Sequence, residues 1–365
     1  MYRPQELAVY IHWPFCKSKC PYCDFYKELN RNVNQDEIIG EYISALERYH
    51  DILPDRIVKS VFFGGGTPSL ITPQNIEKII GFINQKWKTA DNIEISLEAN
   101  PNTRYETMFK ELKSAGVNRL SLGIQSLNDE DLRFLGRTHS VKTALLCLEE
   151  IVQTFDNHSA DLIYALPRQS IRDWQNQLEQ ICFFGLKHIS LYQLTIEEGT
   201  VFARKGIKAA DEDSAVETYN FTRNFLQHTG YEHYEISNFA LNGFASRHNL
   251  TYWLGGDYIG IGKSAHGRIR INNRHLAVTY PFIDEELTAK QRAEELIIMG
   301  LRLTDGINKQ DFSRICGIEF ADFVNREKLN QLKEQKLLIE TDTHVFASYD
   351  GFLLVDALAA ELCPL

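Results

Sequence analysis

The sequence lacks any apolar run that approaches the roughly 20 residues needed to cross a membrane. Its first residues also lack the basic and then apolar layout of a secretory signal peptide. We therefore expect no transmembrane segment and a cytoplasmic location, with any membrane contact made peripherally through a partner protein.

Positive charge is scarce as well, because 39 Lys and Arg face 49 Asp and Glu, a net charge of −10. Proteins that grip nucleic acid usually carry a basic excess, so we expect no nucleic-acid partner. Internal repeats and low-complexity segments are also missing, and a hydrophobic content of 44% is ordinary for a globular protein. The 365 residues correspond to about two domains, or to one large α/β barrel with an appendage.

Cysteine is sparse and unevenly placed, with 7 residues in the chain. A disulfide scaffold would be smaller and more evenly spaced, so we exclude it. Three cysteines crowd into one short stretch near the start of the chain. The other four are scattered, and we interpret them as small buried hydrophobic residues: Cys147, Cys182, Cys316 and Cys363.

Apolar segments and amphipathic helical patterns alternate along the first two thirds of the chain, which predicts six β-then-α units. The predicted strands are residues 7–13, 60–63, 93–98, 119–124, 160–166 and 188–194. The predicted helices are residues 36–49, 73–87, 105–115, 141–155, 171–184 and 210–228. A doubly wound sheet has the same alternation, but the polar motifs follow several successive strands, as ligand sites do in a barrel. We therefore predict an α/β fold built as a partial (β/α)6, TIM-like barrel.

Beyond residue 230 the composition and the pattern of the sequence change. We expect the barrel to occupy residues 1–230 and a connecting segment rich in Gly, Asn and aromatic residues to occupy 231–287. Residues 288–365 are helical and charged, with a short hairpin near residues 337–354. They predict a small C-terminal helical domain of winged-helix type.

The cysteine-rich stretch is Cys16-Lys-Ser-Lys-Cys20-Pro-Tyr-Cys23, a C-x3-C-x2-C pattern directly after the first predicted strand. Three thiolates on one tight loop can hold three irons of a cubane cluster and leave the fourth iron open to a ligand. A zinc ion is the alternative, but it takes four ligands, usually from paired C-x2-C units, and no second pair exists. The pattern favours an iron–sulfur cluster.

This spacing resembles the radical S-adenosylmethionine (SAM) superfamily. The resemblance covers the barrel, and it implies a [4Fe-4S] cluster on Cys16, Cys20 and Cys23, with SAM bound to the open iron. Electron injection into such a cluster can cleave SAM to a deoxyadenosyl radical.

Polar or glycine-rich strings follow the later strands: GGGTPS, E-x-N-P, G-x-Q-S, GR-x-H and DLIY-x-LP. Glycines let the backbone approach a ligand, and amide or guanidinium groups suit the ribose and carboxylate of SAM. A solvated strand end is the alternative for Glu98, and surface ion pairs are the alternative for Arg137 and Asp161.

Together with Y-x-H-x-P-F-C, these strings resemble the group of oxygen-independent coproporphyrinogen III oxidases over nearly the whole chain. The resemblance implies that eight residues contact SAM: Tyr10, Gly65, Gly66, Thr67, Glu98, Gln125, Arg137 and Asp161.

The sequence departs from the oxidases at two places. They carry a further Cys where this sequence has Phe25, and they have more residues before the first cysteine, which is Cys16 here. Both features resemble the sister family of haem chaperones, HemW, and so does the H-N-x-x-Y-W motif of residues 248–253. The resemblance implies haem ligation by His248, with His266 as the second candidate and a cysteine such as Cys316 as a further one. A structural, hydrogen-bonded histidine is the alternative.

Two functions remain open at this point. The first is a haem chaperone without oxidase activity that delivers haem to respiratory proteins. The second is a radical SAM enzyme that oxidatively decarboxylates coproporphyrinogen III. The partners implied by the first are haem, haem-acceptor proteins and an electron donor for the cluster, and a homodimer is one option for the assembly.

Overall fold

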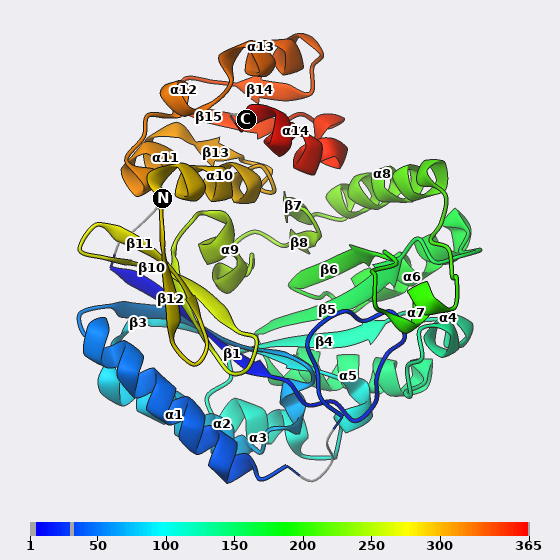
Figure 1. Ribbon diagram of the computed structural model, residues 1–365. Helices are drawn as coiled ribbons and strands as arrows, with labels where there is room; N and C mark the ends of the chain where they lie inside the picture. Colours follow the sequence, from blue (N-terminus) through cyan, green and yellow to red (C-terminus); the bar gives the residue numbers. More distant parts are fainter. Residues whose placement is uncertain (1–4, 30–32, 364–365) are drawn as a thin grey trace.

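The computed structural model describes residues 5–29 and 33–363. Six parallel strands, neighbours in chain order, form the centre of one large sheet (Figure 1). They are β1 (Glu6–Trp13), β2 (Ile57–Gly65), β3 (Lys88–Ala99), β4 (Arg119–Gln125), β5 (Asn157–Tyr164) and β6 (His188–Gln193). A doubly wound sheet would reverse its strand order near the middle. The sequential order therefore confirms the predicted α/β fold with a partial (β/α)6 barrel.

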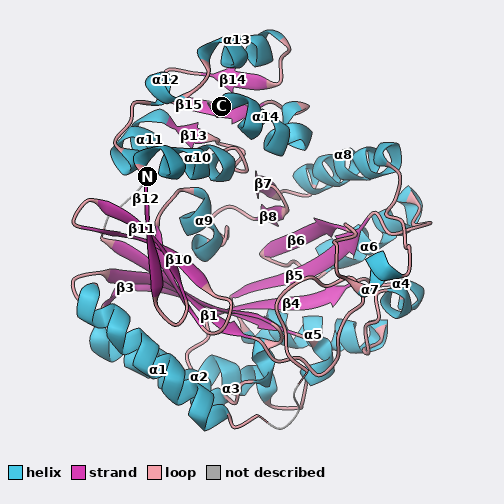
Figure 2. Ribbon diagram, viewed as in Figure 1, coloured by secondary structure: helices cyan, strands magenta, loops and turns pink. Residues whose placement is uncertain are grey.

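Helices join these strands and cover the outer face of the sheet (Figure 2). The long ones are α1 (Gln35–Ile52), α2 (Pro73–Lys86), α5 (Val141–Thr154), α6 (Ile171–Phe183) and α8 (Glu212–His228). Shorter ones are α3 (Met108–Ser114), α4 (Asp129–Phe134) and α7 (Val201–Arg204), of which α4 and α7 were not predicted. The start of α4 is set locally, because the Asn128 side chain accepts the amide N–H groups of Glu130 and Asp131.

The two faces of the barrel strands differ sharply in chemistry. On β4, Leu120 and Leu122 point outward into the hydrophobic core, so Arg119, Ser121 and Gly123 face the interior. Strands β3, β5 and β6 alternate in the same way. The interior of a TIM barrel is usually filled with Val, Ile and Leu. Here it is polar, and it can serve ligands.

Residues 231–287, which we expected to be a connecting segment, are built into the same sheet. Strands β7 (Glu232–Glu235) and β8 (Asn238–Ala240) extend it beyond β6, and β9 (Asp257–Ile261) pairs in parallel with β1. The antiparallel ribbon of β10 (His266–Ile271), β11 (Arg274–Thr279) and β12 (Ile283–Leu287) completes the other edge. A boundary at residue 230 therefore does not divide the sheet. The short helix α9 (Arg247–Trp253) lies between β2 and the C-terminal domain (Figure 1).

The C-terminal domain combines helices with a small antiparallel sheet in the order β13-β15-β14. Its elements are α10 (Ala289–Gly300), β13 (Ile307–Asn308), α11 (Lys309–Cys316), α12 (Phe320–Phe323), α13 (Arg326–Glu334), β14 (Leu338–Glu340), β15 (His344–Ala347) and α14 (Val355–Leu362). The predicted hairpin corresponds to β14 and β15. Across the described ranges, no helix is both long and apolar enough to cross a membrane.

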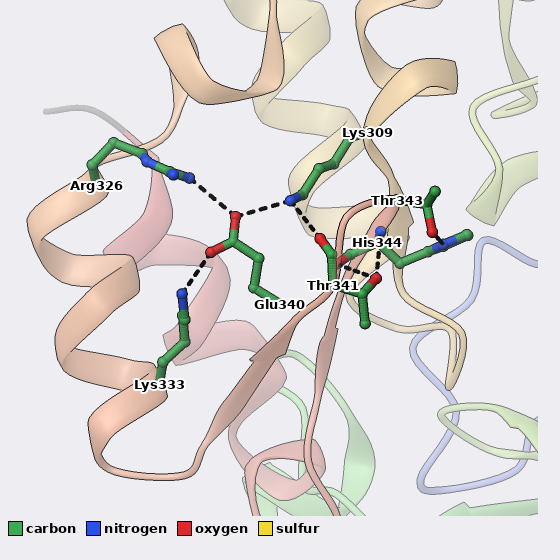
Figure 3. A network of polar contacts seen from close by, with 7 residues as sticks. All are labelled: Lys309, Arg326, Lys333, Glu340, Thr341, Thr343 and His344. Atoms are coloured by element: carbon green, nitrogen blue, oxygen red, sulfur yellow. Dashed lines mark hydrogen bonds and ion pairs between the residues drawn. The ribbon is translucent and has the colours of Figure 1, made fainter.

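One carboxylate ties this domain together (Figure 3). Glu340 accepts hydrogen bonds from Lys309 at 2.9 Å, Arg326 at 3.1 Å and Lys333 at 2.7 Å. Burial opposes ionisation of Glu340, but the three cationic donors outweigh it and lower the pKa to about 2. The group therefore links α11, α13 and β14.

Candidate cofactor site

A cavity of ≈ 460 Å³ lies where the strands β2 to β6 end. A volume of this size suits a ligand as large as a common cofactor. Ten of the residues predicted from the sequence line it: Cys16, Cys20, Cys23, Gly65, Gly66, Thr67, Glu98, Gln125, Arg137 and Asp161. The structure thus brings together side chains that lie up to about 145 residues apart in the chain (161 − 16).

The loop that carries the cysteines leaves β1 after Trp13 and is fastened at its base. The Cys16 N–H donates to the Glu28 carbonyl at 3.0 Å, and the Glu28 N–H donates to the Pro14 carbonyl at 2.8 Å. Within the loop, the Cys23 N–H donates to the Cys20 carbonyl at 3.3 Å. The three thiols therefore face the cavity from a closed loop.

Two of the sulfur atoms receive hydrogen bonds from the cavity wall. The Thr67 hydroxyl donates to Cys16 Sγ, and the Arg137 guanidinium donates to Cys20 Sγ, each at 3.4 Å. Burial raises the pKa of the Cys16 thiol, and the Thr67 hydrogen bond opposes that effect. Donors of this kind stabilise sulfur in its anionic form, which is the form that binds iron. The donor set fits a cluster held by three thiolates.

A single metal ion would need ligands that converge on one point. In the part of the chain that the structure describes, no three His, Cys, Asp or Glu side chains converge in this way. Thiolates that hold separate irons of a cubane are spread further apart.

The glycine loop after β2 lines the cavity and also packs closely against β1. Gly65 has a φ of +111°, and a Cβ there would lie 2.7 Å from the His12 ring. A Cβ on Gly66 would lie 2.7 Å from the Pro14 carbonyl oxygen. The missing side chains therefore make room for the end of β1 and the start of the cysteine loop. Both glycines also line the cavity, so the close approach of their backbone to a ligand stays a prediction.

Two carboxyl groups, one on β3 and one on β5, line the cavity. Glu98 Oε2 accepts the Gly65 N–H at 3.3 Å, and Asp161 Oδ1 accepts the Ser121 hydroxyl at 2.8 Å. Burial and the nearby Asp161 raise the pKa of Glu98 to about 8, and burial raises the pKa of Asp161. Two carboxyl groups held this way are suited to receive a cationic group. Glu98 is thus no solvated strand end.

Arg137 is tied to the wall of the cavity. Its guanidinium donates to the Gly123 carbonyl at 2.9 Å in addition to Cys20 Sγ. The neighbouring Gly136 has a φ of +67°, and a Cβ there would lie 2.5 Å from Pro21 Cδ, so only glycine lets the cysteine loop pack so closely. Gln125, also on this wall, adopts a φ of +68°, a strained conformation of the kind found at binding sites. Neither Arg137 nor Asp161 is placed as a surface ion pair would be.

Two of the predicted site residues lie outside the cavity lining. The Tyr10 hydroxyl lies 3.0 Å from His12 Nδ1, and its ring stacks on Phe62. His248, with 1% of its surface exposed, lies 3.0 Å from the Ser60 hydroxyl through Nδ1 and contacts the Tyr252 hydroxyl through Nε2. Burial lowers the pKa of His248 to about 3, so the ring is neutral. Both of its nitrogens are engaged within the protein.

Further residues line the cavity that the sequence analysis did not identify. They come from the cysteine loop, the segment after β3, and the end of β6: Tyr22, Asn100, Asn102, Tyr192, Thr195 and Glu197. Tyr192 follows the same rule as Glu98 and Gln125, since it stands at the C-terminal end of a parallel strand. That rule, applied to the sixth strand as well, would have found it.

The comparisons with known proteins agree with this geometry. A profile of the radical SAM superfamily matches residues 10–181, and one of the HemN C-terminal domain matches residues 287–354. In the structure of coproporphyrinogen III oxidase (HemN) from Escherichia coli, described as a radical SAM enzyme, the same fold recurs. Its TM-score is 0.81 at 20% identity, over 98% of this chain and 89% of that chain.

Curated relatives match at higher identity. The mitochondrial radical S-adenosyl methionine domain-containing protein 1 of Danio rerio is 34% identical, over 97% of this chain and 86% of that protein. The heme chaperone HemW of Bacillus subtilis is 34% identical, over 95% of this chain and 96% of that protein. The chain therefore belongs to the radical SAM superfamily and, within it, to the family that contains the HemW proteins and their mitochondrial relatives.

Proposed function

We propose that the protein is a haem chaperone that binds haem and delivers it to haem-requiring proteins such as respiratory cytochromes. Cys16, Cys20 and Cys23 would hold a [4Fe-4S] cluster, and the cavity would hold SAM. Relatives named heme chaperone HemW support the proposal, because they match 95% of the chain in both Bacillus subtilis and Lactococcus lactis.

The observation that carries the choice between chaperone and oxidase is the charge of the cavity wall. Its basic side chains are Lys17, Lys27 and Arg137, and its acidic ones are Asp24, Glu98, Asp161 and Glu197. Coproporphyrinogen III carries several propionates, each of which needs a cationic partner when it leaves water. The three basic side chains of the wall, one of which already donates to Cys20 Sγ, offer few such partners and disfavour this substrate. Phe25, on the same wall and 65% exposed, adds an apolar ring where the oxidases carry a thiol.

When bound, the cluster and SAM would supply electron transfer and radical chemistry. The residues of this chain would hold and orient them. Thr67 and Arg137 donate hydrogen bonds to the sulfur ligands. Glu98 would accept a hydrogen bond from the ammonium group of SAM. Gly65, Gly66, Gln125 and Asp161 are further proposed SAM contacts, whereas Tyr10, the eighth residue predicted from the sequence, lies outside the cavity lining.

Haem ligation is assigned in this proposal to His248, with Tyr252 and Trp253 offering aromatic faces for the porphyrin. Both ring nitrogens of His248 are engaged, so ligation requires α9 to move and the Tyr252 hydroxyl to release Nε2. The alternatives differ in access: His266 is exposed, whereas Cys316 is buried and its thiol donates to the Phe312 carbonyl at 3.2 Å.

The decisive experiment incubates the cluster-loaded protein anaerobically with coproporphyrinogen III, SAM and a reductant, and titrates haem into the same preparation. We expect a haem absorption band with saturable binding and no conversion of the porphyrinogen. Formation of protoporphyrinogen would overturn the proposal and establish the oxidase. Phe25→Cys should not create the oxidase, because the charge of the wall is unchanged.

The haem ligand is tested by comparing His248→Ala with His266→Ala. Loss of an axial imidazole should shift the haem absorption band and weaken haem retention, and we expect this only for His248→Ala. A shift confined to His266→Ala would transfer the assignment to His266.

A further inference from the structure

The interior of the barrel contains a buried arginine side chain, Arg119, whose positive charge has no direct partner among the described residues. Arg119 opens β4 with only 2% of its surface exposed. Among the residues that the structure describes, its Nε has no hydrogen-bond partner, and its guanidinium forms no ion pair. Buried charges are normally paired, because transfer from water is costly. A guanidinium in this position therefore requires a compensating charge at longer range.

The register of the strands shows where that charge lies. Arg119 and Ser121 share the inward face of β4, and the Ser121 hydroxyl donates to Asp161 Oδ1 at 2.8 Å. In the β3–β4 pairing, Ser121 lies beside Glu98, and Arg119 lies beside Ser96, one step deeper on the same face. Arg119 thus lies one inward step deeper than Glu98 and, since Asp161 pairs with Gly123, two inward steps deeper than Asp161.

The electrostatics of the carboxylates agree with this placement. Burial raises the pKa of both Glu98 and Asp161, and the positive charge of Arg119 opposes that rise for each of them. Charges that are several ångströms apart interact strongly in a protein interior even without a hydrogen bond. Glu94 is a further buried carboxylate on the inward face of β3, two residues before Ser96, and the charge of Arg119 also acts on His188 and Tyr234. The remaining groups that act on one or the other are the Gly65 N–H, Ser121, Ser190 and Arg137.

We propose that Arg119 is a positioning residue: it is the counter-ion of the Glu98–Asp161 pair, and it keeps that pair ready for a cationic group of the bound ligand. The ligand class is a molecule with an ammonium or sulfonium group, which rests on the proposed SAM cavity. Without Arg119, each carboxyl group would retain its proton more firmly and would attract the cation less.

A titration of the ligand-free protein tests the counter-ion directly. The carboxyl bands of Glu98 and Asp161 are followed by infrared spectroscopy and identified by subtracting the spectra of Glu98→Gln and Asp161→Asn. In Arg119→Met, we expect the midpoint of Glu98 to rise by about 1–2 pH units, as expected for loss of a unit charge several ångströms away. Arg119→Lys keeps the charge and should restore most of the midpoint.

A matched control is available in Arg292, another buried arginine, which donates to the Gly255 carbonyl at 2.7 Å and pairs with Glu295 at 2.7 Å. Arg292→Met should destabilise the fold without moving the midpoint of Glu98. Equal midpoints in Arg119→Met and the unmodified protein would overturn the proposal, as would an equal shift in Arg292→Met. Arg119→Gln replaces Arg119→Met if the latter does not fold.

Calorimetry with SAM provides the second measurement. Arg119→Met should bind SAM about tenfold more weakly near neutral pH, and the deficit should shrink as the pH rises and the pair ionises. A deficit that is the same at every pH would indicate a merely structural role and would count against the proposal. Failure of the unmodified protein to bind SAM would refute the proposed function instead, because the titration above needs no ligand.

Discussion

Glu98 in the barrel and Glu340 in the C-terminal domain are both strand residues withdrawn from solvent, yet their surroundings shift the pKa in opposite directions. Glu98 accepts a single backbone N–H, and burial together with Asp161 raises its pKa to about 8. The side chain of Glu340 is 12% exposed and accepts from three cationic groups, which outweigh burial and lower its pKa to about 2. Within one chain, one glutamate therefore has few hydrogen-bond donors around it, and the other has three cationic donors.

This difference indicates that the barrel is suited to bind a ligand, whereas the polar contacts of the C-terminal domain stabilise its own fold. A carboxylate saturated with internal donors has little capacity left for a ligand, whereas one that lacks them gains most when a cation arrives. The barrel also contains the strained backbone of Gln125 and the buried Arg119, both of which cost stability. None of the described residues of the C-terminal domain, 288–363, lines the cavity.

The largest expected difference between the two regions is the effect on the cluster of removing a cysteine sulfur atom from each. Cys16→Ser should abolish the visible absorption of the cluster, because the iron loses a thiolate ligand. Cys316→Ser, in the C-terminal domain, should leave that absorption intact, since a hydroxyl can still donate to the Phe312 carbonyl. Absorption spectra of both variants after reconstitution provide the measurement. Equal loss in the two variants would contradict the assignment of the cluster.

Removing the charge of Glu98 should weaken the binding of SAM. Glu98→Gln deletes an interaction between charged groups, worth about 1.5–3 kcal/mol, which corresponds to roughly 10–100-fold in affinity by calorimetry. It should also change the pH dependence of stability. Because the folded pKa is raised to about 8, the ligand-free protein should lose stability as the pH rises from the ordinary value of 4.5 towards 8. Glu98→Gln should reduce that slope, and an unchanged slope would contradict the shift.

Glu340→Gln should have the complementary effect. The pKa of Glu340 is lowered, so its stabilising contribution is present above the ordinary pKa of 4.5 and is lost as the pH falls towards 2. At neutral pH, the variant should lose about 1–2 kcal/mol of unfolding free energy, after allowance for the partly exposed donors. Its affinity for SAM should equal that of the unmodified protein. A loss of SAM binding would show that the two regions are coupled.

The smallest expected effects come from two glycines with positive φ, one in each region. Gly136→Ala adds a Cβ 2.5 Å from Pro21, so the cysteine loop must shift and the cluster should be lost faster to a chelator. Gly317, which ends α11, has a φ of +77° and nothing within 4 Å of the added Cβ. Gly317→Ala should cost about 1 kcal/mol of stability from the backbone conformation alone and should leave cluster loss unchanged. Identical rates of cluster loss would refute the role of Gly136.

The sequence was sufficient for the barrel and most of the cavity, because both depend on local patterns. Alternation of strand and helix predicts β1 to β6, and residues at strand ends converge in any parallel barrel. The edges of the sheet were not predicted, because strands of three to six residues in a glycine-rich segment carry no clear period.

The polar interior was visible in the sequence but was not used. Strands buried on both faces are normally continuous apolar runs, yet Arg119 to Gln125 alternates strictly between polar or glycine and apolar residues. That departure marks a barrel with a functional interior. The close packing of Gly65 against the His12 ring could not be predicted, since the position of that ring depends on the register of β1 and β2.

The pairing of β9 with β1 also has a consequence for synthesis on the ribosome. Leu7 pairs with Asp257, so the first strand waits for a partner made 257 − 7 = 250 residues later. At roughly 5–20 residues per second, that delay lasts on the order of 10–50 seconds. During this time the outer edge of β1 is an open template for strands of other chains. Until residues 257–261 have been synthesised, a nascent chain therefore avoids aggregation only if translation is fast or if a molecular chaperone covers that edge.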